Sequence, residues 1–261
     1  MKKRIDVLIA EKGLAPSREK AKTLIIAGKV KAGGRAVKSP SEQFEGDIAI
    51  EVEGHACPYV SRGGLKLEKA VKEFRLRLSD KICMDIGAST GGFTDCMLQN
   101  GARFVYAVDV GYGQFDWSLR NDKRVKLMER TNARYLERQD APIDFVSVDV
   151  SFISLRLIFP AIMRVIGGEA QAVTLIKPQF EAGREHVGKK GVVRDAQVHA
   201  AVIRQTVEHA SSCGLFLQGL TFSPVKGPNG NIEYLALFST EKKEWIADIE
   251  RTVSAAHGEL N

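Results

Sequence analysis

The sequence predicts an α/β fold, in which a doubly wound, Rossmann-like sheet of seven strands follows a small α+β domain. Seven short apolar segments have the composition of strands, and helical stretches lie between most of them. This alternation is typical of a mostly parallel sheet with helices on both faces. The last two segments follow each other without a helix, which predicts one antiparallel edge. The predicted strands are residues 81–87, 103–110, 124–129, 143–150, 171–178, 215–222 and 232–239.

The first 54 residues predict the small α+β domain. Apolar residues recur at helical spacing in 4–14 and 17–29, and Ser17 is a suitable N-cap for the second helix. A Gly-Gly turn then joins two short strands within 30–38, and residues 47–53 form another strand. A glycine and a proline interrupt the pattern after that strand. We expect a first domain at 1–54, a linker at 55–61 and the main domain at 62–261.

Composition excludes several classes of protein. The 261 residues are 44% hydrophobic and 27% charged, as in an ordinary globular chain with a sizeable core. Asp6 interrupts the first apolar run, which argues against a signal peptide, and no segment approaches the roughly 20 apolar residues of a membrane span. The four cysteines and five histidines are scattered, so we expect no metal site and a cytoplasmic protein.

Positive charge is concentrated at the start of the chain. Residues 1–40 hold eleven Lys or Arg and three acids, a local charge of 11 − 3 = +8, whereas the whole chain carries +6. This asymmetry favours a module that binds a polyanion, although a solvated lysine-rich surface is the alternative. The candidate RNA-binding residues are Arg4, Arg18, Lys20, Lys22, Lys29, Lys31 and Arg35.

A glycine-rich loop follows the first strand of the main domain and opens a helix. Its sequence, G-A-S-T-G-G, differs from the G-x-G-x-x-G of dinucleotide binders, and a purely structural turn is the alternative. Asp85 lies in the strand before the loop, and Asp109 ends the next strand, where a carboxylate can accept both hydroxyls of an adenosine ribose. Together these features favour an S-adenosylmethionine site. Its candidate residues are Asp85, Gly87, Ala88, Ser89, Thr90, Gly91, Gly92, Phe93, Asp109, Asn132 and Asp149. Of these, Asn132 could equally serve only its own turn.

Four charged residues occupy positions where charge is costly to bury. Asp149 and Lys177 end apolar strands, at the sheet edge where ligands bind in open α/β folds. Glu233 is expected inside strand 232–239, and Lys66 on a helix before the first strand of the sheet. Because unpaired buried charges are strongly unfavourable, these residues should meet as partners or perform chemistry. Separate ion pairs or surface positions are the alternative.

Several motifs resemble known families. The SREKA and AGKV motifs, within a match over residues 3–53, resemble the RNA-binding domain of the ribosomal-protein-S-four type. SRGGLKL, VDVSF, LIKPQFE and GNIEYL, in this order, resemble the FtsJ-type ribose 2′-O-methyltransferases, and in detail the TlyA (haemolysin A-like) branch. This resemblance implies S-adenosylmethionine as cofactor, structured RNA of ribosomal subunits as partner, and a catalytic tetrad. The tetrad would be Lys66, Asp149, Lys177 and Glu233.

The implied reaction is methyl transfer to the ribose 2′-hydroxyl of a cytidine in ribosomal RNA, with Lys177 taking or orienting the hydroxyl proton and no metal required. Three alternatives remain: a base-directed RNA methyltransferase, a membrane-active haemolysin, and an RNA-binding protein with a relic fold. The sequence lacks a D/N-P-P-Y/F motif and a strongly amphipathic apolar helix, which argues against the first two.

The loop that follows Pro178 is rich in glycine and charge. Its cations Arg184, Lys189 and Lys190 could contact phosphates or simply be solvated, and its Phe180 could stack on a base or pack under the loop.

Overall fold

The computed structural model describes residues 2–12, 14–15, 17–52, 57–243, 245 and 247–260. The chain divides into two compact units, Met1–Pro58 and Tyr59–Asn261. This division falls inside the predicted linker, of which residues 55 and 56 lie outside the described residues. Tyr59 belongs to the second unit and is buried there.

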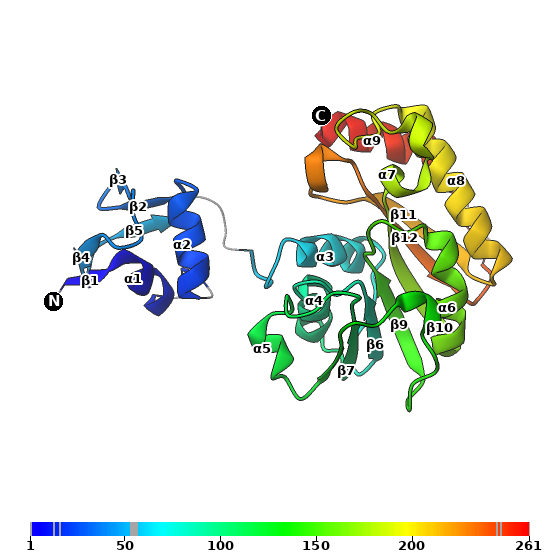
Figure 1. Cartoon of the computed structure of the whole chain (residues 1–261), viewed down its shortest axis with the longest axis horizontal. Coiled ribbons are helices and arrows are strands. Elements are labelled where there is room, and N and C mark those ends of the chain that lie inside the picture. Colours follow the sequence, from blue (N-terminus) through cyan, green and yellow to red (C-terminus); the bar gives the residue numbers. More distant parts are fainter. Residues whose placement is uncertain are drawn as a thin grey trace. The chain divides into compact units, whose positions relative to one another are not determined.

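The first unit combines two helices with two small antiparallel sheets (Figure 1). Helices α1 (Ile5–Glu11) and α2 (Arg18–Ile26) bury an apolar core that includes Ile5, Ile9 and Ile25. Ser17 caps α2, as predicted, because its Oγ accepts a hydrogen bond from Lys20 N. The strands are β1 (Lys2–Arg4) paired with β4 (Gln43–Glu45), and β2 (Val30–Ala32) paired with both β3 (Arg35–Ala36) and β5 (Ile50–Val52).

The second unit is built on the predicted seven-stranded sheet, with the order β11-β12-β10-β9-β6-β7-β8. All pairs are parallel except those that β12 forms with β10 and β11. The reversed strand is therefore the second from one edge. The strands are β6 (Ile82–Ile86), β7 (Phe104–Val108), β8 (Val125–Met128), β9 (Ile143–Val148), β10 (Ile166–Ile176), β11 (Phe216–Phe222) and β12 (Tyr234–Ser239).

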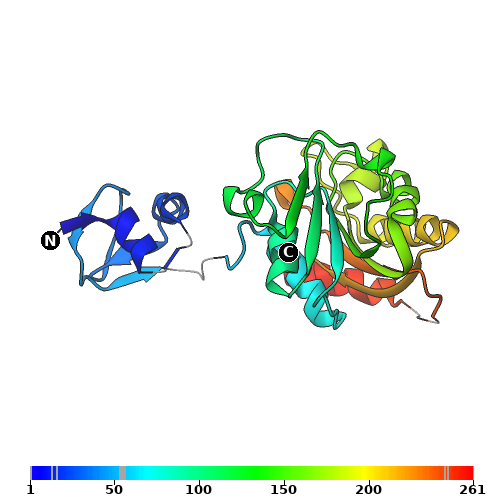
Figure 2. The ribbon, with the colours of Figure 1, turned by 90° about the horizontal axis from the view of Figure 1, so that it is seen from below.

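Helices cover both faces of this sheet (Figures 1 and 2). On one face α3 (Gly63–Glu73) packs against α4 (Gly92–Gln99), and on the other α6 (Phe159–Val165) and α8 (Ala196–Ser212) bury the core of the sheet. The shorter helices α5 (Trp117–Arg120) and α7 (Pro178–Glu181) follow β7 and β10, and α9 (Ile249–Leu260) packs on α8 and β11. Within the part of the chain that the structure describes, no helix has the length and apolar character of a membrane span.

The sheet brings the predicted site residues to one edge. Gly87, Asp109 and Asp149 directly follow β6, β7 and β9, whose last residues are paired in register. Glu233 was expected inside a strand, but β12 begins only at Tyr234. Because β12 runs against β10, its first residue pairs with the last residue of β10, and Glu233 lies beside the end of the strand that carries Lys177.

Candidate active site

The glycine-rich loop joins β6 to α4 and requires glycine at two positions. Gly87 has a φ of 87°, and a side chain there would meet the Asp149 carbonyl oxygen at 2.4 Å. Gly91 has a φ of 96° and is the N-cap of α4, and its missing side chain would collide with Leu119. Gly91 therefore shapes the loop and does not face the site. The loop wraps closely around the end of β9, which brings Asp149 next to it.

Asp85 lies beneath this loop and has no exposed surface. Its two oxygens accept hydrogen bonds from Thr94 Oγ1 at 2.7 Å and Ser147 Oγ at 3.1 Å. Burial raises the pKa of Asp85 to about 7, against the effect of these hydrogen bonds, and the charge of Asp149 adds to the rise. The predicted cofactor ligand Asp85 thus supports α4 and β9 from below, since full burial leaves no path to a ligand.

A cavity of about 460 Å³ opens on the other side of the loop. Asp109 and Asn132, both predicted to bind the cofactor, line it together with Gly87, Ser89 and Asp149. Asp109 accepts hydrogen bonds from Ser89 N at 2.7 Å and Gly111 N at 2.6 Å, so the carboxylate is fixed in place. Oδ2 keeps a lone pair for a ligand hydroxyl, whereas Oδ1 also accepts a hydrogen bond of 3.4 Å from Gln114 Nε2. Asn132 also caps the short 3₁₀ helix Ala133–Tyr135, because its Oδ1 accepts a hydrogen bond from Arg134 N, and so it serves its own turn while it lines the cavity.

The four predicted catalytic residues form one network, in which Lys177 and Glu233 are buried and Lys66 and Asp149 are half-buried. Lys66 Nζ lies 2.7 Å from Glu233 Oε2 and 3.6 Å from Asp149 Oδ2. Lys177 Nζ lies 2.5 Å from Asp149 Oδ1, and so Asp149 bridges the two lysines. Glu233 is fully buried, and its second oxygen, Oε1, has no hydrogen-bond partner among the residues that the structure describes. A side chain at Gly227 would meet that oxygen at 2.1 Å, so the β11–β12 loop closes over Glu233.

The electrostatics of the network keep Lys66 positively charged. Burial is the largest influence on its pKa and lowers it, but the charges of Asp149 and Glu233, with their hydrogen bonds, outweigh burial and leave the pKa above its ordinary value. Lys66 is therefore a fixed ammonium at the centre of the site.

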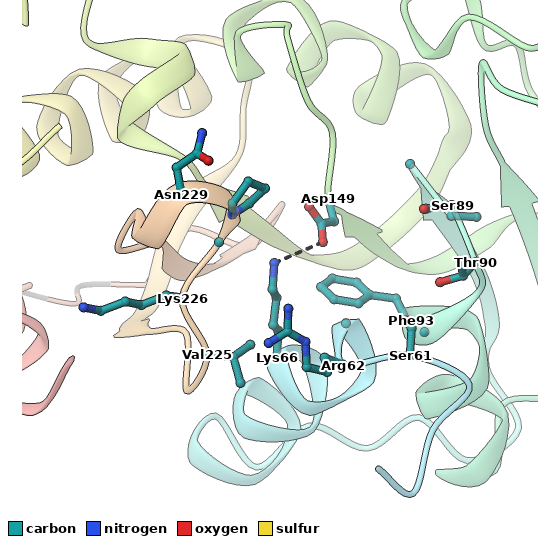
Figure 3. Close-up of a pocket in the computed structure, with 16 residues that line it drawn as sticks. Ser61, Arg62, Lys66, Ser89, Thr90, Phe93, Asp149, Val225, Lys226 and Asn229 are labelled. Carbon is teal, nitrogen blue, oxygen red and sulfur yellow. Dashed lines mark ion pairs between the residues drawn. The ribbon is translucent and has the colours of Figure 1, made fainter. Parts of the chain in front are cut away.

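A second cavity of about 470 Å³ holds Lys66 and Asp149 (Figure 3). The loop residues Gly87, Ala88, Ser89, Thr90, Gly92 and Phe93 line one side. Several lining residues were not predicted from the sequence: Ser61, Arg62, Gly63, Val225, Lys226, Gly227, Pro228 and Asn229. Those of the β11–β12 loop carried no signal in the sequence, because their approach depends on β12 being inserted next to β10. Gly87, Ser89 and Asp149 line both cavities, and so the two meet at the glycine-rich loop and at Asp149, while Lys177 and Glu233 line neither.

The loop that follows α7 contributes little to either cavity. Arg184, Lys189 and Lys190 are exposed, which leaves the choice between phosphate contacts and solvation open. The ring of Phe180 lies 5.0 Å from that of Phe152, so Phe180 packs on an aromatic neighbour. Phe152, missed by the sequence analysis, is 91% exposed and lines the cavity of Asp109.

The predicted RNA-binding side chains of the first unit are partly committed to acids. Arg4 and Arg18 both bind Asp6, at 3.0 Å and 2.9 Å. Burial alone raises the pKa of Asp6, but these arginines outweigh it and lower the pKa. Two further pairs, Lys22 with Glu19 and Arg35 with Glu42, neutralise part of the predicted surface. Lys20 and Lys29 are exposed, and Lys31 is half-buried in β2.

Comparisons with known proteins agree with this architecture. Residues 59–240 match the FtsJ-like methyltransferase family, and residues 3–47 match the S4 domain. The protein YqxC of Bacillus subtilis is 53% identical over 90% of this chain and 84% of its own. The 16S/23S rRNA (cytidine-2′-O)-methyltransferase TlyA of Mycobacterium tuberculosis is 42% identical over 91% of this chain and 90% of its own.

A solved structure of a haemolysin-like protein from Streptococcus thermophilus superimposes with a TM-score of 0.79 at 45% identity, covering 99% of this chain and 96% of that one. Fold, site geometry and sequence similarity all point to one family. The chain belongs to the TlyA (haemolysin A-like) family, in which an S4 domain precedes an FtsJ-like methyltransferase domain.

Proposed function

We propose that this protein transfers a methyl group from S-adenosylmethionine to the ribose 2′-hydroxyl of a cytidine in ribosomal RNA. The observation that carries the proposal is the Lys66–Asp149–Lys177–Glu233 network, whose central residue, Asp149, lines both cavities. Two cavities that meet at charged groups suit a reaction between a cofactor and a separate substrate. The relative from M. tuberculosis is named for the same reaction, as a 16S/23S rRNA (cytidine-2′-O)-methyltransferase.

The cavity of Asp109 is the proposed place of the cofactor's adenosine. Its volume of about 460 Å³ lies in the range of small-molecule sites, and its lining combines apolar side chains with the carboxylate of Asp109. Asp109 is placed to accept hydrogen bonds from the ribose hydroxyls. Asn132 lines the same cavity and is placed to contact the adenine base. When bound, S-adenosylmethionine supplies an activated methyl group on a sulfonium.

The cavity of Lys66 is the proposed place of the target ribose. Lys177, from its neutral amine, accepts the proton of the 2′-hydroxyl as the oxygen attacks the methyl group in line. Asp149 holds the Lys177 nitrogen at 2.5 Å and so fixes its position. Lys66, anchored by Glu233, provides a positive charge that stabilises the oxygen as it loses its proton.

The S4 unit is the proposed RNA anchor. Its exposed cations, among them Lys20 and Lys29, suit contacts with phosphates of a structured RNA. The partner would be a ribosomal subunit in the cytoplasm, because ribosomal RNA is the substrate.

The test is to incubate the full chain with ribosomal subunits and labelled S-adenosylmethionine, and to digest the RNA to nucleosides for mass spectrometry. We expect 2′-O-methylcytidine, with the modified linkage resistant to alkali. A methyl group on a base, with an alkali-labile linkage, would replace the proposal by base-directed methylation.

A further inference from the structure

Ser151 lies two residues after Asp149, where the chain leaves β9. Its Oγ accepts a hydrogen bond of 3.1 Å from Lys177 Nζ. The same nitrogen lies 2.5 Å from Asp149 Oδ1. This short segment after β9 thus presents two acceptors to one lysine.

The position of Ser151 differs from that of the other network residues. Ser151 lines the cavity of Asp109, whereas Lys66 lines the other cavity and Asp149 lines both. Lys177 itself has a side chain that is only 8% exposed. Its nitrogen is therefore held by two residues that line the cavities, Asp149 and Ser151, although Lys177 itself lines neither cavity. Immediately after Ser151 the chain bends, and Phe152 in this bend has a left-handed backbone with a φ of 63°.

We propose that Ser151 is a positioning residue that aims the lone pair of Lys177 at the target hydroxyl. This proposal rests on the proposed function. A neutral amine carries two hydrogens and one lone pair in tetrahedral directions. With one N–H donated to Ser151 Oγ and the nitrogen held against Asp149 Oδ1, the directions open to the lone pair are restricted. The 2′-hydroxyl proton moves to this lone pair as the bond from oxygen to the methyl carbon forms and the bond from sulfur to that carbon breaks, so that Lys177 ends as an ammonium.

The contrast with Lys66 supports this assignment. Lys66 has carboxylates on two sides, which hold an ammonium but oppose the loss of its proton. Lys177 has one carboxylate and one neutral hydroxyl. A hydroxyl acceptor fixes the direction of the nitrogen without adding a second negative charge, and this is what a proton acceptor requires.

The test compares Ser151→Ala with Ser151→Thr in the full chain, with single-turnover methyl transfer to ribosomal subunits and S-adenosylmethionine affinity measured in parallel. Ser151→Ala should lower the rate at saturating cofactor by about tenfold to thirtyfold while leaving the cofactor Kd within about twofold. Ser151→Thr should restore most of the rate, because threonine keeps the Oγ acceptor. The matched control is Ser254→Ala, on the exposed surface of α9, which should behave as wild type.

Three results would overturn the proposal: a wild-type rate for Ser151→Ala, a rate loss explained by a weaker cofactor Kd, or no recovery in Ser151→Thr. The second result would make Ser151 a direct cofactor contact. The proposed function fails separately, if the wild-type chain yields no 2′-O-methylated nucleoside or if Lys177→Ala keeps the wild-type rate.

Discussion

The two lysines of the catalytic network share Asp149 but differ in their other neighbours. Lys66 lies between Asp149 and the fully buried Glu233, which keep it charged by raising its pKa against burial. Lys177 lies between Asp149 and the hydroxyl of Ser151. Two lysines of one network can therefore have different roles, because the second partner of each lysine differs in charge. In the proposed mechanism, the Lys66 end of the network keeps a charge and the Lys177 end exchanges a proton.

The most severe test of this difference is Lys177→Ala. We expect methyl transfer to fall by about a hundredfold to ten-thousandfold, because groups that exchange protons typically contribute this much. The fold should persist, since Asp149 keeps Lys66 as a partner. The measurement is the single-turnover rate at saturating cofactor, with thermal unfolding as control. A rate within threefold of wild type would remove lysine from the proton transfer.

Glu233→Gln should have a smaller effect. The amide retains the size of the side chain and an oxygen for Lys66, but it removes one of the two charges that hold the ammonium. We expect a rate loss of about tenfold, equal to about 1.4 kcal/mol in activation free energy. A loss as large as that of Lys177→Ala, measured in the same assay, would show that the two ends are not separable.

Asp109→Ala should weaken cofactor binding without affecting either the Lys66 end or the Lys177 end of the network. Its carboxylate organises the Ser89 and Gly111 amides at the proposed cofactor cavity, so the Kd for S-adenosylmethionine should rise by about fivefold. The rate at saturating cofactor should stay near wild type. Calorimetric titration gives the Kd, with Asp122→Ala, a carboxylate that pairs with Arg124 before β8, as control. A reduced rate with unchanged affinity would contradict the proposed place of the adenosine.

Asp85→Asn should change the rate least and the pH dependence of stability most clearly. The pKa of Asp85 is about 7 in the folded chain and near 3.8 when exposed, so between these values only the folded state holds the proton. The contribution of Asp85 to the free energy of unfolding is therefore fully present below about pH 4 and is lost as the pH rises to about 7. The total is up to about 4 kcal/mol. Urea unfolding at a series of pH values should show this decline in wild type and a flatter profile in Asp85→Asn. Parallel profiles would refute the shifted pKa.

Much of this molecule was predictable because its signals are local. Apolar runs predicted the seven strands, and the resemblance pointed to the four network residues before their contacts were known. Three features were not predictable from local patterns. Strands β1 and β4 are three residues each and pair across about forty residues, so neither has a periodic pattern. Glu233 was placed inside β12, because alternation cannot show where a strand begins. The loop with Lys226 and Asn229 lies at the cavity because β12 is inserted between β10 and β11, and a local pattern in the sequence does not show this strand order.

The division of tasks is tested most directly by replacing each lysine with arginine and measuring both single-turnover rates side by side. A guanidinium keeps the positive charge but stays protonated and cannot accept a proton. The account predicts that Lys66→Arg retains at least about a tenth of the wild-type rate, whereas Lys177→Arg loses at least about a hundredfold. Equal losses, or a more active Lys177→Arg, would contradict the assignment of Lys177 as the proton acceptor.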